Sequence, residues 1–207
     1  MAEVLETIKL YYDFKSPFTY LAMEPTYGLE QTHRVRLRFI PHELAVQDAY
    51  GGELDRRKQR DWNKVRYLYA DVRRFANERG MIIRGPQKIF DSRLALQSGL
   101  YADRHGRFRP YAERVFERFF KRELDIENLD ALCAVAAEAG LDPAGLRGYV
   151  AGEGPAELKA AADEAERDGV FGVPTFVVAS ELFWGNDRVE WVIKKLDAMK
   201  LRRTRAA

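Results

Sequence analysis

Cysteine is almost absent from this sequence of 207 residues. Cys133 is the single cysteine, so the chain can form neither an intrachain disulfide nor a CxxC redox pair. The three histidines, His33, His42 and His105, are scattered and occur in no HExxH spacing. We therefore expect no metal ion in this protein, and we interpret Cys133 as a small buried apolar residue of an alanine-rich helix.

The sequence also lacks long apolar runs and an excess of charge of one sign. No stretch approaches the ~18 apolar residues of a membrane-spanning helix, and the acidic first residues do not read as a secretory signal. Lys and Arg total 34 and Asp and Glu total 32, which gives no reason to expect nucleic acid or an anionic membrane as a partner. We interpret the basic C-terminal residues as a solvated helix end and expect a cytoplasmic protein.

What the chain contains is an ordinary globular composition, with 46% hydrophobic and 32% charged residues. The length fits one domain, or one domain with a large insertion. Strands are predicted near both ends of the chain, over residues 8–14, 35–40, 174–179 and 182–184. A helix predicted over 17–31 joins the first two strands, so the chain begins with a βαβ unit and a parallel strand pair.

Helical periodicity dominates between these ends. Residues 61–79 carry an apolar face at spacings of three and four, formed by Trp62, Val65, Leu68, Tyr69, Val72 and Phe75. Further helices are predicted over 91–103, 110–122, 129–139, 143–151, 156–168 and 188–199. We therefore predict an α/β domain formed by residues 1–45 and 155–207, interrupted by an all-helical insertion over 46–154.

Three junctions are candidates for chemistry. Ser16-Pro17 follows the first strand, where Ser16 can be the N-cap of a helix, a donor to an anion bound there, or both. Val173-Pro174 precedes the third strand as a plain turn, or as a cis bond that leaves the Val173 backbone free to pair with an extended ligand. Asn186 and Asp187 are either caps of the last helix or groups that hold a ligand, with Asp187 pairing an ammonium.

Together, these motifs resemble one family. DF-x-SPF-x-YLA over residues 13–22, FGVPT over 171–175 and FWGNDR over 183–188 are similar to the kappa-class glutathione transferases, and more closely to the 2-hydroxychromene-2-carboxylate isomerases. The resemblance spans nearly the whole chain. It implies a thioredoxin-like domain with a large all-helical insertion, an architecture shared with DsbA-type thiol oxidoreductases. Here Ser16 and Thr19 stand where those oxidoreductases carry the two cysteines, so a self-contained disulfide oxidoreductase is excluded.

The resemblance implies glutathione as cofactor and assigns roles to individual residues. Ser16 is then the catalytic residue and donates a hydrogen bond to the glutathione sulfur, which favours the thiolate. Val173, before a cis Pro174, pairs its backbone with the glutathione cysteine. Asn186 and Asp187 hold the γ-glutamyl end.

For the glycyl carboxylate of glutathione, the resemblance offers Lys64, for which a solvated helix position is an equal alternative. A substrate pocket is expected between the two domains. Phe14 and Phe18 form its aromatic wall, or both lie in the core. We interpret Arg93 as a structural ion-pair partner, although it is also a candidate for the substrate carboxylate. Lys15 departs from the apolar residue expected there in the isomerases, and either alters the pocket mouth or points into solvent.

In the resembling isomerases, the bound thiolate attacks an aromatic substrate, the ring opens, a bond rotates, and the thiol is then eliminated. We therefore expect a glutathione-dependent isomerase with a small aromatic substrate, and a homodimer. A kappa-class-like glutathione transferase uses the same thiolate, so the motifs leave it open. A redox-inactive thioredoxin-fold binding protein is the third alternative.

Overall fold

The computed structural model describes residues 5–45 and 58–203. Its centre is a four-stranded sheet in the order β2-β1-β3-β4, formed by β1 (Glu6–Tyr12), β2 (Val35–Pro41), β3 (Thr175–Val178) and β4 (Glu181–Trp184). β1 and β2 are parallel, as the βαβ pattern predicts, whereas β3 is antiparallel to both β1 and β4. β1 ends two residues before the predicted strand does, because the chain turns at Asp13, whose carbonyl accepts a hydrogen bond from the Ser16 N–H at 3.0 Å.

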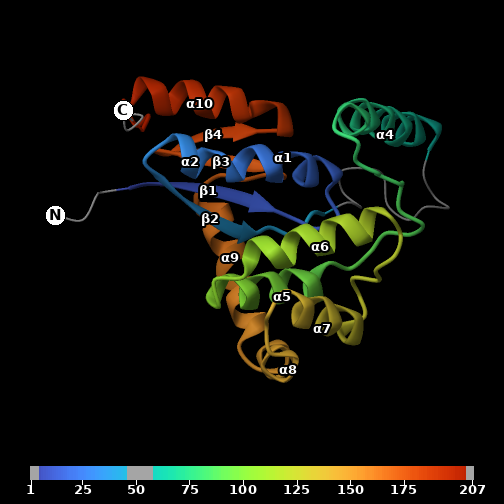
Figure 1. The fold of residues 1–207 in the computed structure, drawn as a ribbon. Helices are drawn as coiled ribbons and strands as arrows, with labels where there is room; N and C mark the ends of the chain where they lie inside the picture. Colours follow the sequence, from blue (N-terminus) through green and yellow to red (C-terminus); the bar gives the residue numbers. More distant parts are fainter. Residues whose placement is uncertain (1–4, 46–57, 204–207) are drawn as a thin grey trace.

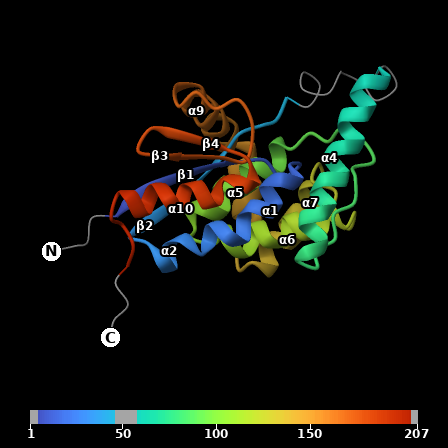
Figure 2. The same ribbon diagram turned by 90° about the horizontal axis from the view of Figure 1, so that it is seen from above.

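Helices cover both faces of this sheet. Figure 2 shows α9 (Gly154–Arg167) on one side, and α1 (Pro17–Tyr27) with α10 (Val189–Ala198) on the other. Side chains of a strand alternate between the two faces. Accordingly, Tyr11 packs in a small cluster with α9, whereas Leu10 belongs to the main core. The predicted helix over 17–31 is broken at Gly28 into α1 and the short α2 (Leu29–Thr32).

The remaining helices lie between β2 and β3 in the sequence. α5 (Arg93–Arg104), α6 (Phe108–Phe120), α7 (Leu129–Glu138) and α8 (Pro143–Ala151) gather beyond the β2 edge of the sheet, whereas α4 (Gln59–Glu78) lies apart, near the start of α1 (Figure 1). This arrangement confirms the predicted thioredoxin-like fold with a helical insertion. The limits of the insertion at residues 46 and 154 stay a prediction.

Local sequence signals explain where several helices begin. The Asn128 side chain accepts a hydrogen bond from the Ala131 N–H at 3.1 Å and starts α7. Asp142 accepts from the N–H groups of Ala144 and Gly145 at 3.0 and 2.9 Å and starts α8. Such caps satisfy backbone donors that have no partner within the helix. The starts of α7 and α8 therefore agree with the predicted ones.

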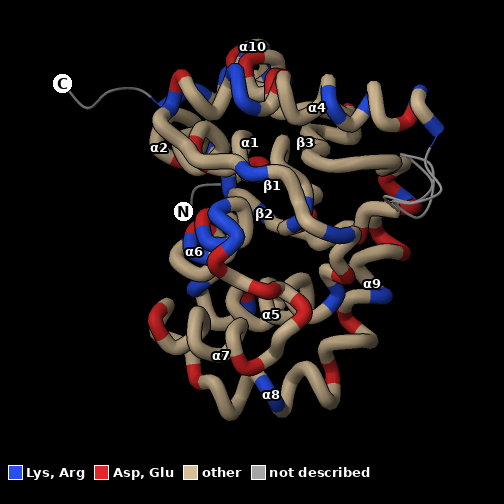
Figure 3. The backbone as a smooth tube through the Cα atoms, turned by 90° about the vertical axis from the view of Figure 1, so that its right-hand side faces the viewer, with Lys and Arg blue, Asp and Glu red and all other residues tan. Residues whose placement is uncertain are grey.

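Two kinds of feature, a membrane-spanning helix and a metal-binding cluster, are not found in the described part of the chain. None of its helices is long and apolar enough to cross a bilayer. It also contains no group of three or more His, Cys, Asp or Glu side chains able to hold a metal ion. Basic and acidic residues both occur along the outer helices α6, α9 and α10 (Figure 3).

Candidate functional site

The loop between β1 and α1 presents Ser16 as a true helix cap. Its hydroxyl oxygen accepts a hydrogen bond from the Thr19 N–H at 3.1 Å, and the hydroxyl donates to the carbonyl oxygen of Val173 at 3.4 Å. Ser16 is only 3% exposed. The hydroxyl therefore keeps a short contact with its own helix and a long, weak one with the loop before β3.

The Val173–Pro174 peptide bond is cis, as the resemblance implies. The Val173 N–H makes no hydrogen bond with any residue that the structure describes, and its carbonyl accepts only the long bond from Ser16. The Gly185 N–H donates to the Pro174 carbonyl at 2.9 Å. This bond holds the segment after β4 beside the cis proline, so two of the predicted junctions are physically joined.

The segment after β4 brings Asn186 and Asp187 to the same place. Gly185 has a φ of +125°, a conformation that glycine adopts far more easily than other residues. Asn186 is 8% exposed and Asp187 lies at the surface, where its carboxylate is 3.1 Å from the Arg188 guanidinium. Neither side chain caps a helix: both residues lie in a 3-10 turn (Asn186–Arg188), and the helix α10 begins after it. The capping alternative is therefore wrong.

A cavity of about 1110 Å³ connects these junctions. Ser16 and Phe18 line it at the start of α1, and Val173 and Pro174 line it at the cis peptide. From the segment after β4 it receives Trp184, Gly185, Asn186, Asp187 and Arg188. The structure thus brings together three motifs that lie as much as 172 residues apart in the sequence, from Ser16 to Arg188.

Two candidate residues do not reach this cavity. Phe14 is fully buried among Tyr12, Tyr111 and Phe116, with its ring centroid 4.8 Å from that of Phe116. It therefore belongs to the core and not to the substrate wall, because its ring packs against Tyr111 and Phe116 of α6. Lys64 is exposed on α4 and is not among the described residues that line the cavity. Its role toward glutathione stays a prediction.

Two further residues behave as the sequence suggested. The Arg93 guanidinium pairs with the Asp91 carboxylate, with Nε 2.9 Å from both oxygens, which is the structural role preferred for it. Cys133 is 3% exposed on α7. Burial raises the pKa of its thiol, so it is a poor nucleophile at neutral pH.

The Lys15 side chain is not exposed to solvent, and its ammonium lies farther from the nearest carboxylates than in a close ion pair. Its side chain is 9% exposed and lines the cavity beside Ser16. Beneath it lies Asp13, a fully buried carboxylate that accepts hydrogen bonds from the N–H groups of Lys15 and Leu44 and from the Ser92 hydroxyl. Burial raises the pKa of Asp13, and the Lys15 ammonium and these donors oppose that rise.

The sequence interpretation missed part of the cavity wall. Trp62, Val65 and Tyr69 on α4 line the cavity, and Phe90 and Phe119 line it from the other side. The periodicity of residues 61–79 predicts this apolar face of α4, but not that it lines a cavity. The missing signal is tertiary: the structure leaves most of that face only partly buried, so it faces the cavity and not a packed core.

Comparisons with known proteins place the chain in a family. The model of the DsbA-like thioredoxin domain family matches residues 7–197. A 2-hydroxychromene-2-carboxylate isomerase from Sphingobium xenophagum is 27% identical over 190 residues, covering 90% of this chain and 96% of the relative. The enzyme of that name from Pseudomonas putida is 28% identical over 186 residues, covering 88% and 90%.

Solved structures show the same likeness. A 2-hydroxychromene-2-carboxylate isomerase superposes with a TM-score of 0.78 at 26% identity, covering 94% of this chain and 96% of that one. A probable DsbA oxidoreductase from Streptomyces coelicolor superposes with a TM-score of 0.76 at 17% identity, covering 98% and 93%, and supports the fold alone. The resemblance to 2-hydroxychromene-2-carboxylate isomerases, stated from the sequence motifs, is therefore confirmed.

Proposed function

The chain belongs to the DsbA-like thioredoxin domain family, and we propose that it is a glutathione-dependent isomerase similar to 2-hydroxychromene-2-carboxylate isomerase. The relatives of that name, which match most of its length, support isomerase chemistry on a small molecule. When bound, glutathione supplies a thiolate that adds to an aromatic substrate and is eliminated again, so that it is regenerated.

One observation carries the glutathione assignment: Ser16 and Val173 line the same cavity, and the Ser16 hydroxyl donates there only a long hydrogen bond to the Val173 carbonyl. The Ser16 hydroxyl donates a hydrogen bond of 3.4 Å to the Val173 carbonyl oxygen. This bond is long and weak, so the hydroxyl can donate to a thiolate instead. The Val173 N–H makes no hydrogen bond within the described residues, and an extended peptide-like ligand needs such a donor for strand-like pairing. These groups fit a short peptide that carries a thiol.

The chain's own residues then hold and activate the thiol. Ser16 donates a hydrogen bond to the sulfur while its oxygen keeps the bond from the Thr19 N–H, and the α1 N-terminus adds positive potential that favours the thiolate. Asn186 and Asp187 bind the γ-glutamyl end, where the Asp187 carboxylate exchanges its exposed contact with Arg188 for the ligand ammonium. Phe18 packs against the substrate, and Lys64 is proposed to reach the glycyl carboxylate.

Calorimetric titration with glutathione tests the cofactor assignment. We expect saturable binding that is weakened by Asp187→Ala. Asp163→Ala is a matched control, because Asp163 is also an exposed carboxylate in an ion pair, with Lys159 on α9, away from the cavity. Absence of binding at millimolar glutathione contradicts the cofactor assignment, whereas equal binding by wild type and Asp187→Ala contradicts the role of Asp187.

Stoichiometry separates the isomerase from the transferase. An isomerase converts 2-hydroxychromene-2-carboxylate while total glutathione stays constant, whereas a transferase consumes one glutathione for each product. Glutathione-independent binding of the aromatic compound without turnover would instead indicate a binding protein. We also propose that the active form is a homodimer, which light scattering at assay concentration measures directly.

A further inference from the structure

Lys15 carries a buried ammonium that the described residues hold only loosely. Its Nζ lies 3.5 Å from the Phe90 carbonyl oxygen, 3.7 Å from the nearer Asp13 carboxylate oxygen and 4.0 Å from the Glu43 carboxylate. Charge-assisted hydrogen bonds of this kind are normally ~2.7–2.9 Å long. The ammonium therefore lies near three acceptors of the described residues, but at distances longer than a strong hydrogen bond.

Asp13 explains why such an ammonium is tolerated there. The Asp13 carboxylate already accepts three hydrogen bonds, at 3.0 Å from the Lys15 N–H, 2.8 Å from the Leu44 N–H and 3.1 Å from the Ser92 hydroxyl. It therefore balances the Lys15 charge through space and does not need the ammonium as a donor. A buried charge without a close partner is costly, so the N–H bonds of Lys15 are suited to an incoming anion.

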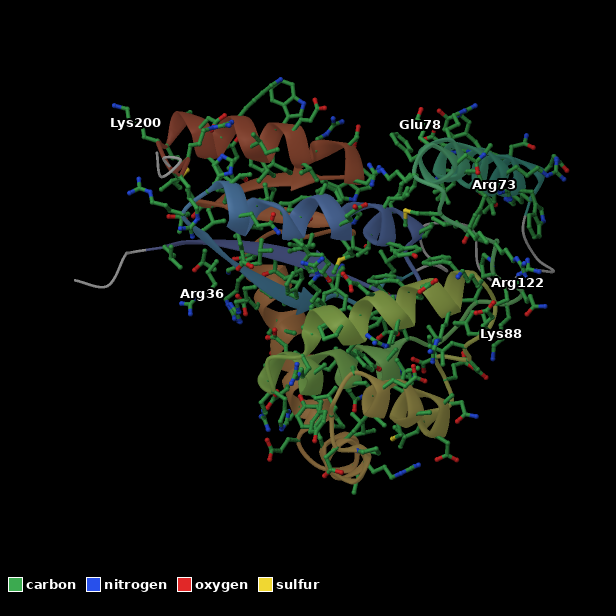
Figure 4. All side chains as sticks on the ribbon, in the orientation of Figure 1. Arg36, Arg73, Glu78, Lys88, Arg122 and Lys200 are labelled. Atoms are coloured by element: carbon green, nitrogen blue, oxygen red, sulfur yellow. The ribbon has the colours of Figure 1, made fainter. Side chains whose placement is uncertain are left out.

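The charges around the cavity favour an acidic ligand. Its described lining contains five cations against two carboxylates, Asp71 and Asp187. The cations are Lys15, Arg66, Arg73, Lys88 and Arg188. Arg73 and Lys88 lie at the α4 end of the molecule in Figure 4. Among these five, only the Lys15 side chain is nine-tenths buried, whereas the others are exposed. Lys15 is thus the cation best shielded from water.

The wall next to Lys15 is aromatic. Its ammonium is nearest to the carbonyl of Phe90, whose ring meets that of Phe119 edge-on at 5.1 Å between centroids. Both phenylalanines line the cavity, as does Phe18 two residues beyond Ser16. Flat rings bind well against such edge-to-face pairs. A planar aromatic group and an anionic group fit side by side here.

We propose that Lys15 anchors the carboxylate of an aromatic substrate whose ring lies against Phe90 and Phe119. This inference deepens the isomerase function proposed above and rests on it. It makes Lys15 a specificity-determining residue of this chain, selecting aromatic carboxylates over neutral aromatic compounds. The thiol that Ser16 holds then meets a substrate fixed at its anionic end.

Binding of trans-cinnamate and of its neutral amide, cinnamamide, tests the anchor. We expect calorimetry to show tighter binding of cinnamate to the wild type, and a loss of about tenfold or more in Lys15→Met, the fold-change for one hydrogen bond to a charged group. Cinnamamide affinity should stay unchanged in that variant. Lys15→Arg should keep the preference for cinnamate. Lys159→Met, which removes an exposed cation of α9 that is paired with Asp163 and is not among the cavity-lining residues, should change either affinity little.

Several results would overturn the anchor. These are equal binding of cinnamate and cinnamamide by the wild type, no cinnamate binding at millimolar concentration, or unchanged cinnamate affinity in Lys15→Met. If Lys15→Met fails to fold, two measurements still test the proposal: the preference of the wild type for cinnamate over cinnamamide, and the retention of that preference in Lys15→Arg. Glutathione titrations of the same proteins separate the two proposals. If glutathione binds but cinnamate affinity does not depend on Lys15, only the proposed role of Lys15 is contradicted. If cinnamate affinity depends on Lys15 but glutathione does not bind, only the proposed glutathione cofactor is contradicted.

Discussion

Replacing Ser16 by alanine separates its structural role from its catalytic one. The change removes the oxygen that caps α1 and accepts the Thr19 N–H at 3.1 Å. Loss of such a cap lowers the free energy of unfolding by ~1 kcal/mol, which shifts Tm by about 2–4 °C in a chain of this size. Because folded proteins are stable by ~5–15 kcal/mol, nearly all molecules stay folded in Ser16→Ala. A large loss of turnover therefore cannot come from unfolding.

The catalytic part of the same change is expected to be larger. Removing one preorganised donor to a developing anionic centre costs on the order of a hundredfold in rate, so kcat of thiol-dependent isomerisation should fall by about that factor. Asn128→Ala is the matched control, because it removes the equivalent cap bond to the Ala131 N–H of α7, away from the cavity. Urea unfolding should show similar losses of stability in both variants. Full turnover in Ser16→Ala, or an equal loss of turnover in Asn128→Ala, would refute the reasoning.

Three further predictions test the core, the loop after β4 and the acid response. Phe14→Ala should lower the free energy of unfolding by ~3–5 kcal/mol in urea, because Phe14 is fully buried, whereas Phe18→Ala should cost less and raise KM. Gly185→Ala should weaken glutathione binding in calorimetry, because the new Cβ would lie 2.6 Å from the Asp187 carboxylate and the φ of +125° at residue 185 strains an alanine. Unchanged affinity would argue against Asp187 as a ligand. Hydrogen bonding from Arg202 lowers the pKa of Asp197 from 3.8 to about 2. The ionised form therefore stabilises the fold above pH ~4, and this contribution is lost as the pH falls toward 2. Asp197→Asn should flatten that part of the pH dependence of unfolding at low salt, and an unchanged profile would contradict it.

Much of the fold was readable because local signals agreed with the tertiary arrangement. The start of α8 at Asp142-Pro143 and of α1 at Ser16-Pro17 follow from caps, which act over three or four residues. The parallel pairing of β1 with β2 follows from a strand, a helix and a strand in the first residues. The break at Gly28 did not follow, because an apolar pattern continues through it on both sides.

The sequence predicts the motifs of the candidate site, but not all of the side chains that line its cavity. Ser16, Pro174 and Asn186 stand at junctions that the sequence marks with turn and cap residues, and all three reach the cavity. Phe14 and Phe18 look equivalent in the sequence, four residues apart beside the same motif. The first packs into the core against α6 and the second lines the cavity, a difference that spacing does not encode.

The sequence by itself determined the class of fold, the absence of a dithiol and the residue types at the three junctions. These depend on composition and on contacts between near neighbours. Only the tertiary structure decided that Lys15 is buried above Asp13, that Phe14 leaves the site, and that α4 faces the cavity. The physical reason is that burial is a property of the packed chain. Whether a lysine meets water or a cavity depends on elements far from it in the sequence, here the Phe90 carbonyl and the loop that holds Pro174.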